Sequence, residues 1–450
     1  MRNDRRRKGN CLALCVGSCL GFALPAYGNV DAGPFPGRQA FGVGTIVVVR
    51  QVPESEVMTQ QLDSLPGRLV PGPETMFGDA PFGRELSREQ LEQIDQELLS
   101  NILEIEQPGE RTLALVRAAR FKILEQDFPT AQLALDRART ASLQEPDPRL
   151  RDLRIMSVVD TLIQLAEAQV GEATADPLLI GGLDRPPSRS GEQRLIDLRQ
   201  ANDAFNQAAE LSTQIRQPAY QSEKLFKVVE RQAASGQSVA VEVVLRGPDA
   251  RPDLEELFPE LRQIVDRMLV EAAGHAWNIH RLAWRDQGLL AVATSCSKAR
   301  QFDRSLSVAS SIPSPVVRSE AFIRIAETET RRSTPEKATL AYSESARAIS
   351  AVPIDDLRAT LTNVLIDSLV SSGRFIDARA CIPLYPDEPR RIAALGAIAE
   401  SQGRRGLGDE ARQWIAREVR PEHRSLMYRR VNDGVLYSLE RYRTDALMRQ

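Results

Sequence analysis

Three histidines are the side chains in this sequence best suited to metal binding or acid–base chemistry: His275, His280 and His423. Zinc-binding helices present two histidines four residues apart, because that spacing places both imidazoles on one face. His275 and His280 are five residues apart, so a helix would turn them to different faces. The spacing therefore does not indicate a metal site, and we predict neither a bound metal nor a cofactor.

Nucleophile and phosphate-binding motifs do not appear in the sequence either. It holds no Gly-x-Ser-x-Gly turn, and no glycine-rich loop precedes an expected helix. Pairs of Asp and Glu are frequent, as on any solvated helical surface, and none stands out by its context. The sequence predicts a protein that is not an enzyme.

One alternative keeps small-ligand chemistry open at the junction between the two halves of the chain. His275, Trp277, His280 and Trp284 lie close together there, and the tryptophans, seven residues apart, are expected on one helical face as core. A deep pocket with convergent polar groups at this junction would indicate an enzyme or a carbohydrate-binding protein.

Five segments in the C-terminal half begin with an arginine that is followed by an apolar residue seven positions later. These marker arginines are Arg285, Arg318, Arg358, Arg391 and Arg424, spaced by 33, 40, 33 and 33 residues. A fixed period of about 20–50 residues is typical of a stacked helical solenoid, because each repeat buries its core only against its neighbours. We therefore predict an all-α solenoid of helical hairpins. Each arginine should stand at the start of a first helix, in contact with carbonyl or acidic groups of the preceding hairpin.

Further positions repeat when each marker arginine is counted as position zero. Small residues recur at position 20, aromatic residues stand at position 17 in two units, and Gly373 stands at position 15. An earlier segment carries a similar arrangement. The residues are Ser305, Ala338, Ala378 and Ala411 at position 20, Phe302 and Phe375 at 17, Gly373 at 15, and Leu115, Ala118, Ala119, Phe128 and Ala131 in the earlier segment.

This pattern resembles the tetratricopeptide repeat, in which small residues let the second helix of each hairpin approach the first. The chain departs from that family in its 33-residue period and in lacking the family's large tryptophan. The family's terminal proline is absent from each unit, and Ile312-Pro313 and Val352-Pro353 punctuate the loops instead. The resemblance implies a right-handed α-solenoid in the C-terminal half.

In the tetratricopeptide family the first helices line a concave groove that binds peptides. The resemblance thus implies a candidate partner-binding stripe, acidic at position 9 and basic at position 13. The alternative is that these residues form ion pairs four residues apart on a solvated helix face, each worth about 0.2–0.5 kcal/mol. The candidate residues are Glu327, Asp367, Glu400 and Asp433 at position 9, with Lys298, Arg331 and Arg404 at position 13.

The N-terminus is typical of an export signal. Basic residues precede an apolar run from Cys11 to Leu24, and Ala26-Tyr27-Gly28 supplies the small residues that a signal peptidase needs. The run is shorter than the roughly 20 residues of a membrane span. We predict cleavage after Gly28 and a periplasmic or extracellular chain without a membrane span. Val16-Gly17-Ser18-Cys19 loosely resembles a bacterial lipobox, so a lipid anchor at Cys19 is the alternative.

Charge argues against a nucleic-acid partner. Without residues 1–28 the chain keeps 53 basic and 60 acidic residues, a net charge of −7, and such a surface does not attract anionic polymers. Only Cys296 and Cys381 remain after processing, on different helices of non-adjacent units, so no disulfide is expected between them.

Composition and periodicity divide the chain into six parts. Thr45 to Val52 would favour a strand within a flexible leader of low order, and Ser238 to Leu245 fits either a helix end or a strand. The parts are a signal peptide (1–28), a Pro/Gly-rich leader (29–85), an N-terminal helical region with one tetratricopeptide-like hairpin (86–170), a linker (171–192), a helical connector (193–283) and the repeats (284–450).

These observations favour an exported helical-repeat scaffold that binds a protein or peptide partner through its solenoid surface. An architectural or oligomerising envelope protein without a groove ligand is the first alternative, and an exposed apolar patch at an end of the solenoid would favour it. An enzyme or small-ligand binder at the junction is the second.

Overall fold

The computed structural model describes residues 88–174, 190–245 and 256–448. All of the described residues belong to one compact unit, Ser87–Gln450. The predicted export signal, the lipobox cysteine Cys19 and the leader with its strand-like run lie outside the described residues, as does most of the predicted linker.

The described secondary structure is entirely helical, and no strand occurs within the described ranges. α3 (Arg88–Leu103) precedes a series of hairpins, and α18 (Pro421–Met448) follows it. A π-helical turn η1 (Ala240–Val244) extends α8, and a short helix η3 (Ile382–Leu384) follows α15. The hairpins are α4 (Pro108–Leu124) with α5 (Phe128–Leu143), α6 (Pro148–Thr174) with α7 (Gly191–Thr213), α8 (Pro218–Val239) with α9 (Phe258–Trp277), α10 (Leu282–Lys298) with α11 (Phe302–Ser311), α12 (Pro315–Arg331) with α13 (Pro335–Ser350), α14 (Asp355–Ser371) with α15 (Phe375–Ala380), and α16 (Glu388–Arg404) with α17 (Gly408–Glu418).

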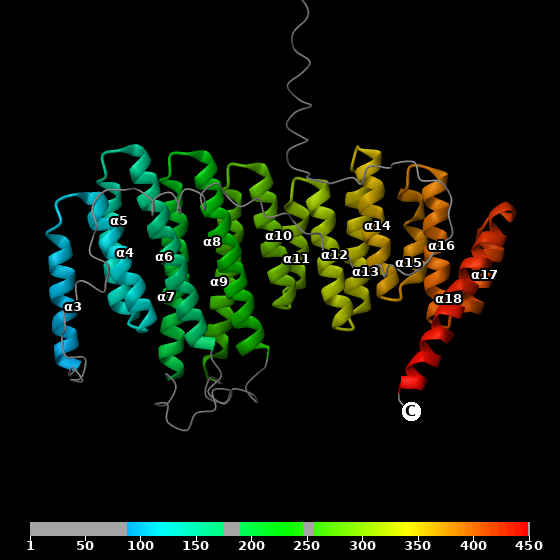
Figure 1. Ribbon diagram of the computed structural model, residues 1–450, viewed down its shortest axis with the longest axis horizontal. Coiled ribbons are helices and arrows are strands. Elements are labelled where there is room, and N and C mark those ends of the chain that lie inside the picture. The colour runs from blue at the N-terminus through cyan, green and yellow to red at the C-terminus, as the bar shows by residue number, and fades with distance from the viewer. Residues whose placement is uncertain (1–87, 175–189, 246–255, 449–450) are drawn as a thin grey trace, which may run out of the picture. The chain divides into compact units, whose positions relative to one another are not determined.

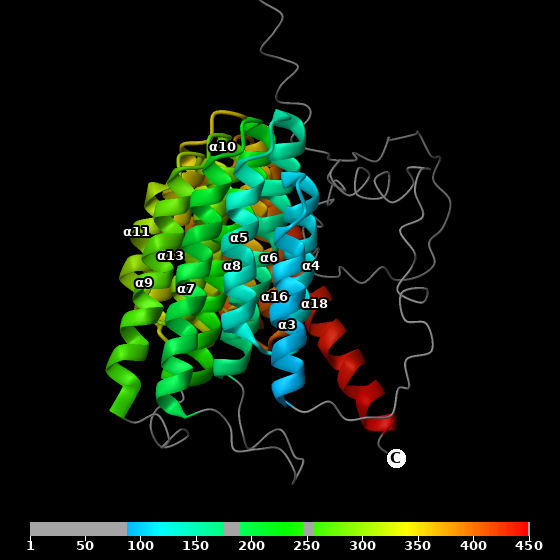
Figure 2. The same ribbon diagram turned by 90° about the vertical axis from the view of Figure 1, so that its left-hand side faces the viewer.

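The hairpins stand side by side in chain order (Figure 1). We call the even-numbered helices α4 to α18 the A helices and the odd-numbered helices α5 to α17 the B helices. Each A helix packs against the B helix of its own hairpin and against the next A helix. Figure 2 shows A helices such as α4, α6 and α16 on one side and B helices such as α9, α11 and α13 on the other. The array thus has one face made of A helices (the A face), and the predicted all-α solenoid is confirmed.

The repeated apolar and small positions form the core of the array. At position 7, Val292, Ile325 and Leu365 are wholly buried, and so are the small residues at position 20. The Ser305 hydroxyl at position 20 donates to the Ala293 carbonyl oxygen of the A helix at 2.9 Å, which shows how closely the two helices approach. Burying a large apolar side chain stabilises the fold by about 1.5–3 kcal/mol. The 33-residue period therefore reflects the recurrence of the side chains that form the core between helices.

The turn between A and B helices requires a left-handed backbone at position 15. The residue that follows donates its backbone N–H back to the A helix, as Arg374 does to the Leu369 carbonyl at 2.8 Å, which is the Schellman arrangement of helix ends. The sequence pattern indicated this position only at Gly373. All described residues with positive φ stand there, at φ between 59° and 79°: Gln126, Arg300, Ser333, Gly373 and Gly406.

Glycine at this turn should stabilise the protein. Ser333→Gly relieves the strain that a Cβ meets at φ 59°, and it should raise the free energy of unfolding by about 0.5–1 kcal/mol. Urea denaturation followed by circular dichroism checks the change. Ser343→Gly, at an exposed position inside α13, is the matched control and should lower the stability by about 0.5 kcal/mol. Equal losses of stability in Ser333→Gly and Ser343→Gly would contradict strain at the turn.

The middle of the chain continues the same array with longer helices. α7, α8 and α9, within the predicted connector, pair into hairpins just as the later helices do. The ambiguous segment from Ser238 to Leu245 is helical through η1. The expectation that Trp277 and Trp284 share a helical face was wrong, because α9 ends at Trp277 and a turn separates it from α10.

Candidate partner-binding face

Four of the five marker arginines hold the loop that leads into their own A helix. Arg318 Nε donates to the Ile312 carbonyl at 2.8 Å, and its Nη2 donates to the Pro313 carbonyl at 2.9 Å. The predicted carbonyl contact is thus confirmed for these four, and apart from Pro313 the acceptors belong to buried loop residues. The other bonds are Arg358 to Val352 at 3.2 Å, Arg391 to Tyr385 at 2.8 and 3.0 Å, and Arg424 to Val419 at 2.8 Å, and Arg111 of the earlier segment bonds Ile105 at 2.8 Å.

The first marker arginine makes a different contact. The Arg285 guanidinium lies over the Trp277 ring, 5.3 Å from its centroid, and that tryptophan is 46% exposed. Trp284 packs against Phe226 instead, with ring centroids 4.8 Å apart. The tryptophans considered for a junction pocket therefore make separate packing contacts.

A side chain in the first turns of several A helices holds the N-terminus of the next A helix. Asp152 of α6 accepts from the backbone amides of Arg216 and Gln217, both at 3.2 Å, just before α8. Ser222 of α8 accepts from the amide that precedes α10 at 3.3 Å, and Asp286 of α10 accepts from the Ser314 amide at the start of α12. Helix N-termini leave backbone amides without intrahelical partners. Here the preceding A helix supplies the acceptors.

Arginines at position 14 hold the other end of the A helices. Arg332 donates to the Ser297 and Lys298 carbonyls at 2.5 and 2.6 Å, at the C-terminus of α10. Arg405 donates in the same way to the Ser371 carbonyl of α14 at 2.7 Å. Cations bind favourably to the free carbonyls at a helix C-terminus. Adjacent A helices are therefore fixed in register at their ends, and the side chains of the A face keep a regular spacing.

Two of the acidic residues predicted at position 9 already have partners within the protein. Glu327 of α12 accepts from the Ser368 hydroxyl of α14 at 2.8 Å. Glu400 of α16 pairs with Arg404 on its own helix and with Arg430 of α18 at 3.3 Å. These carboxylates bridge neighbouring A helices, a contact that the pattern along one helix does not reveal.

The other two acidic residues are exposed on the A face, Asp367 on α14 and Asp433 on α18. The Asp367 side chain is accessible to solvent, but neighbouring atoms partly desolvate its carboxyl and raise its pKa above the usual 3.8. Burial, and after it the charge of Asp367, raises the pKa of Tyr385 to about 12. At position 13, Lys298 and Arg331 are exposed as well. The partner-binding role of these residues remains a prediction.

A polar cluster shared by α7, α8 and α9 was not predicted from the sequence. Gln232, wholly buried on α8, donates to Asn202 Oδ1 at 3.0 Å and to Asn206 Oδ1 at 3.3 Å. Both asparagines donate to Glu271 Oε2, at 2.6 and 2.8 Å, and His275 Nε2 lies 3.0 Å from Asn206 Oδ1. The four-residue spacings within α7 and α9 were a usable signal, but the contact depends on three helices meeting.

The histidine of this cluster should make the stability depend on pH. Burial lowers the pKa of His275 below 6.5, against the opposing effect of Glu271. The unfolded chain therefore takes up a proton before the folded chain does, and stability should fall as pH drops below about 6.5. Urea denaturation at about pH 7.5 and about pH 5.5 measures this loss.

His275→Gln keeps a donor toward Asn206 but cannot titrate, so it should reduce the loss of stability between these two pH values. The carboxyls of Asp203, Asp286 and Asp367 have raised pKa values and act in the opposite direction, near their own pKa values. They are present in both proteins and cancel in the comparison. An identical pH dependence in both proteins would contradict the assignment to His275.

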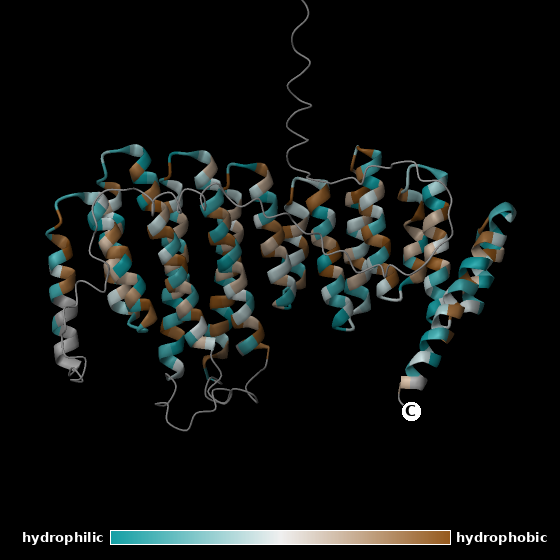
Figure 3. Ribbon diagram, in the orientation of Figure 1, coloured by the Kyte–Doolittle hydropathy of each residue, from teal (hydrophilic) through white to brown (hydrophobic). Residues whose placement is uncertain are grey.

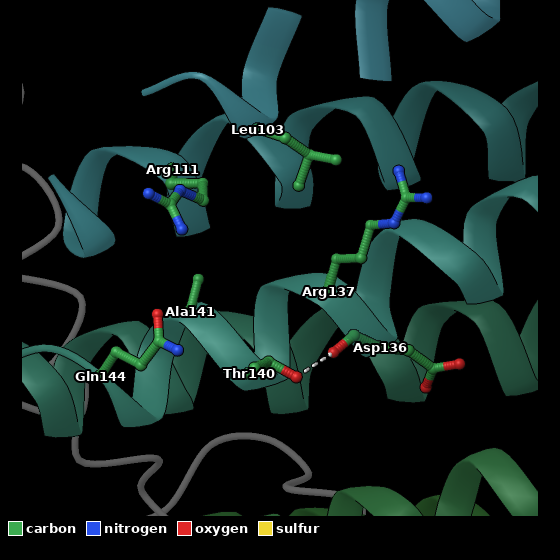
Figure 4. Close-up of a pocket in the computed structure, with 7 residues that line it drawn as sticks. All are labelled: Leu103, Arg111, Asp136, Arg137, Thr140, Ala141 and Gln144. Atoms are coloured by element: carbon green, nitrogen blue, oxygen red, sulfur yellow. Dashed lines mark hydrogen bonds between the residues drawn. The ribbon is translucent and has the colours of Figure 1, made fainter. Parts of the chain in front are cut away.

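Two hollows open on the surface of the array. The first, about 310 Å³, lies between the start of α4 and α5, and Figure 4 shows Arg111 facing the α5 residues across it. Arg111 is already bound to its loop, and Thr140 bonds within α5 to the Asp136 carbonyl at 3.0 Å. The second, about 520 Å³, lies between α16 and α18 and includes Arg404 of the predicted stripe.

Other sites for chemistry are sparse in the described part of the chain. No group of three or more His, Cys, Asp or Glu residues that could hold a metal occurs there. Cys296 and Cys381 are free and buried, and burial raises the pKa of their thiols to about 12 and about 11. No described helix is long and apolar enough to cross a membrane, and each mixes polar with apolar residues (Figure 3).

Comparison with known proteins gives similarities to solved structures. No family model matches the chain. No curated protein matches it either. Among solved structures, it is similar to Ton1535 from Thermococcus onnurineus NA1, with 13% identity, 77% of this chain and 86% of that chain covered, and a TM-score of 0.26. It is also similar to a circular tandem repeat protein with novel repeat topology, with 13% identity, 80% and 92% covered, and a TM-score of 0.37.

Proposed function

We propose that this chain is an exported, non-enzymatic helical-repeat scaffold, and that it binds a protein or peptide partner on the A face of its C-terminal hairpins. The supporting observation is the repeated position 9, which places Asp367 and Asp433 at equivalent exposed sites of A helices held in fixed register. Solenoids bind partners through such extended faces of equivalent side chains. The resemblance to tetratricopeptide repeats points to the same face.

The structure decides which residues test this proposal. Charge reversal at Glu327 or Glu400 would break contacts between A helices, so it would confuse binding with stability. Asp367→Lys with Asp433→Lys changes two exposed side chains instead. Asp303→Lys with Glu336→Lys makes the same change of charge at exposed positions of the B helices α11 and α13.

Partner recovery from the native envelope fraction is the measurement. The A-face double variant should recover a stoichiometric polypeptide about tenfold less well than the parent, and the B-helix control within about twofold. The A-face double variant must also unfold at the same temperature as the parent, so that the lower recovery reflects weaker binding and not lower stability. Equal recovery by both double variants removes the A face as the binding surface.

One observation favours an architectural role as a second candidate. The C-terminal half of α18 exposes several large apolar residues, which on monomeric surfaces often mark association sites. Sedimentation velocity of the mature chain over a wide concentration range tests this, and a purely monomeric chain would exclude it. The residues are Leu436, Leu439 and Tyr442, exposed by 57%, 50% and 75%.

A further inference from the structure

The hollow between α16 and α18 gathers three arginines beside two tyrosines. Its volume is about 520 Å³, and it lies where the second half of α18 crosses the end of α16. Figure 2 shows α18 leaving the array on the side of the A helices, so this hollow borders the A face. Its lining residues are Arg404, Arg405, Arg441, Tyr437, Tyr442, Ser438 and Asp445.

Two of the guanidinium groups are held in place by the protein. Arg404 lies over the Tyr437 ring, 4.6 Å from its centroid, and pairs with Glu400. Arg405 lies over the Phe375 ring at 5.5 Å and donates to the Ser371 carbonyl at 2.7 Å. A guanidinium has five N–H donors, so each arginine keeps donors beyond these contacts. Holding the groups in advance lowers the entropy cost of binding an anion.

The third guanidinium adds positive charge with little internal compensation. Arg441 is 74% exposed, and its Nε lies 4.0 Å from Asp445, at the limit of an ion pair. Asp445 is the one acidic residue in the lining, against three arginines. Arginine binds carboxylates through two parallel hydrogen bonds, and the faces of Tyr437 and Tyr442 offer apolar contact beside them.

We propose that this hollow binds an acidic peptide segment of the protein partner, with side-chain carboxylates bound by Arg404 and Arg441. This proposal rests on the proposed function, because it assigns the chemistry of one part of the partner. Asp433 lies earlier on α18, so the partner presents a basic stretch toward the acidic residues of the A face and an acidic stretch toward the hollow. Opposite charges at two neighbouring places would fix the direction in which the partner lies.

The test uses purified mature chain and a fluorescent, end-blocked oligoglutamate peptide, with binding followed by anisotropy at low salt. Arg441→Gln should weaken binding about tenfold, and Arg404→Gln with Arg441→Gln should weaken it further. Arg443→Gln is the matched control, since Arg443 is exposed on the same helix but does not line the hollow. It should change binding less than about twofold.

Three results would overturn the proposal. The first is that oligoglutamate does not bind the parent chain. The second is that Arg441→Gln and Arg443→Gln lose the same amount of oligoglutamate affinity, which indicates unspecific charge attraction. The third is displacement by inorganic phosphate as effective as by unlabelled peptide, which indicates a phosphate site. The Asp367→Lys, Asp433→Lys variant separates this proposal from the proposed function. If both proposals hold, this variant loses partner recovery and keeps oligoglutamate binding. Unchanged partner recovery contradicts the proposed function alone, and a parent chain that does not bind oligoglutamate contradicts the hollow alone.

Discussion

Replacing Gly434 with alanine should lower the stability of the C-terminal end by about 3 kcal/mol, near the upper end of overpacking effects. A Cβ at Gly434 on α18 would overlap the Glu400 carbonyl oxygen and approach the Arg404 amide nitrogen of α16 to 2.9 Å. Gly403 on α16 faces the Val431 carbonyl in the same way. The two helices touch through their backbones, which cannot move aside as a flexible side chain can.

Hydrogen exchange measures this effect where it arises. Gly434→Ala should lose amide protection in α16 and α18 and also lose oligoglutamate binding, because the hollow depends on that crossing. Gly274→Ala in α9 is the control, since its Cβ would meet open space, and it should raise stability by about 0.5–1 kcal/mol. Protection of α18 unchanged by Gly434→Ala would contradict the close packing.

Arg318→Met should destabilise the protein by about 2–3 kcal/mol. Methionine keeps the apolar stem but removes the bonds to the Ile312 and Pro313 carbonyls, and Ile312 is wholly buried. Hydrogen bonds from charged groups contribute about 1.5–3 kcal/mol, and a buried acceptor left without a partner adds to the loss. Urea denaturation of the mature chain gives the change in free energy.

A second arginine on the same helix provides the control for this loss. Arg324 is 49% exposed on its side chain and pairs only with Glu320, four residues earlier on α12. Exposed pairs of this kind contribute about 0.3–0.5 kcal/mol, so Arg324→Met should cost little. Equal costs at Arg318 and Arg324 would show that the marker arginine does not stabilise the loop.

The fold of the C-terminal half could be predicted because its signals are local. Val292, Ile325 and Leu365 recur at one position, and each must be buried wherever the helices stack. The earlier hairpins were less visible because α6, α7 and α8 are longer, which breaks the 33-residue period. The residue type does not reveal the turn position at Arg300 and Ser333, which adopt the same φ without being glycine. Gly406 is a glycine at the same position, but only Gly373 was recognised.

The candidate site was predicted only in part, because its decisive contacts join different helices. Position 9 was found from the sequence, but the bonds of Glu327 to α14 and of Glu400 to α18 depend on how neighbouring helices are offset. The hollow depends on the crossing of α16 and α18. That crossing requires Gly403 and Gly434, each of which faces the backbone of the opposite helix, and no short sequence pattern encodes their separation.

Site-specific photo-crosslinking in cells tests the central claim, that the A face binds a partner. Benzoylphenylalanine placed at Asp367 probes the A face, and the same group at Leu340, 45% exposed on α13, probes a B helix. We predict a discrete adduct with one polypeptide from position 367 and none from position 340. An adduct from position 340 without one from position 367 would contradict the account.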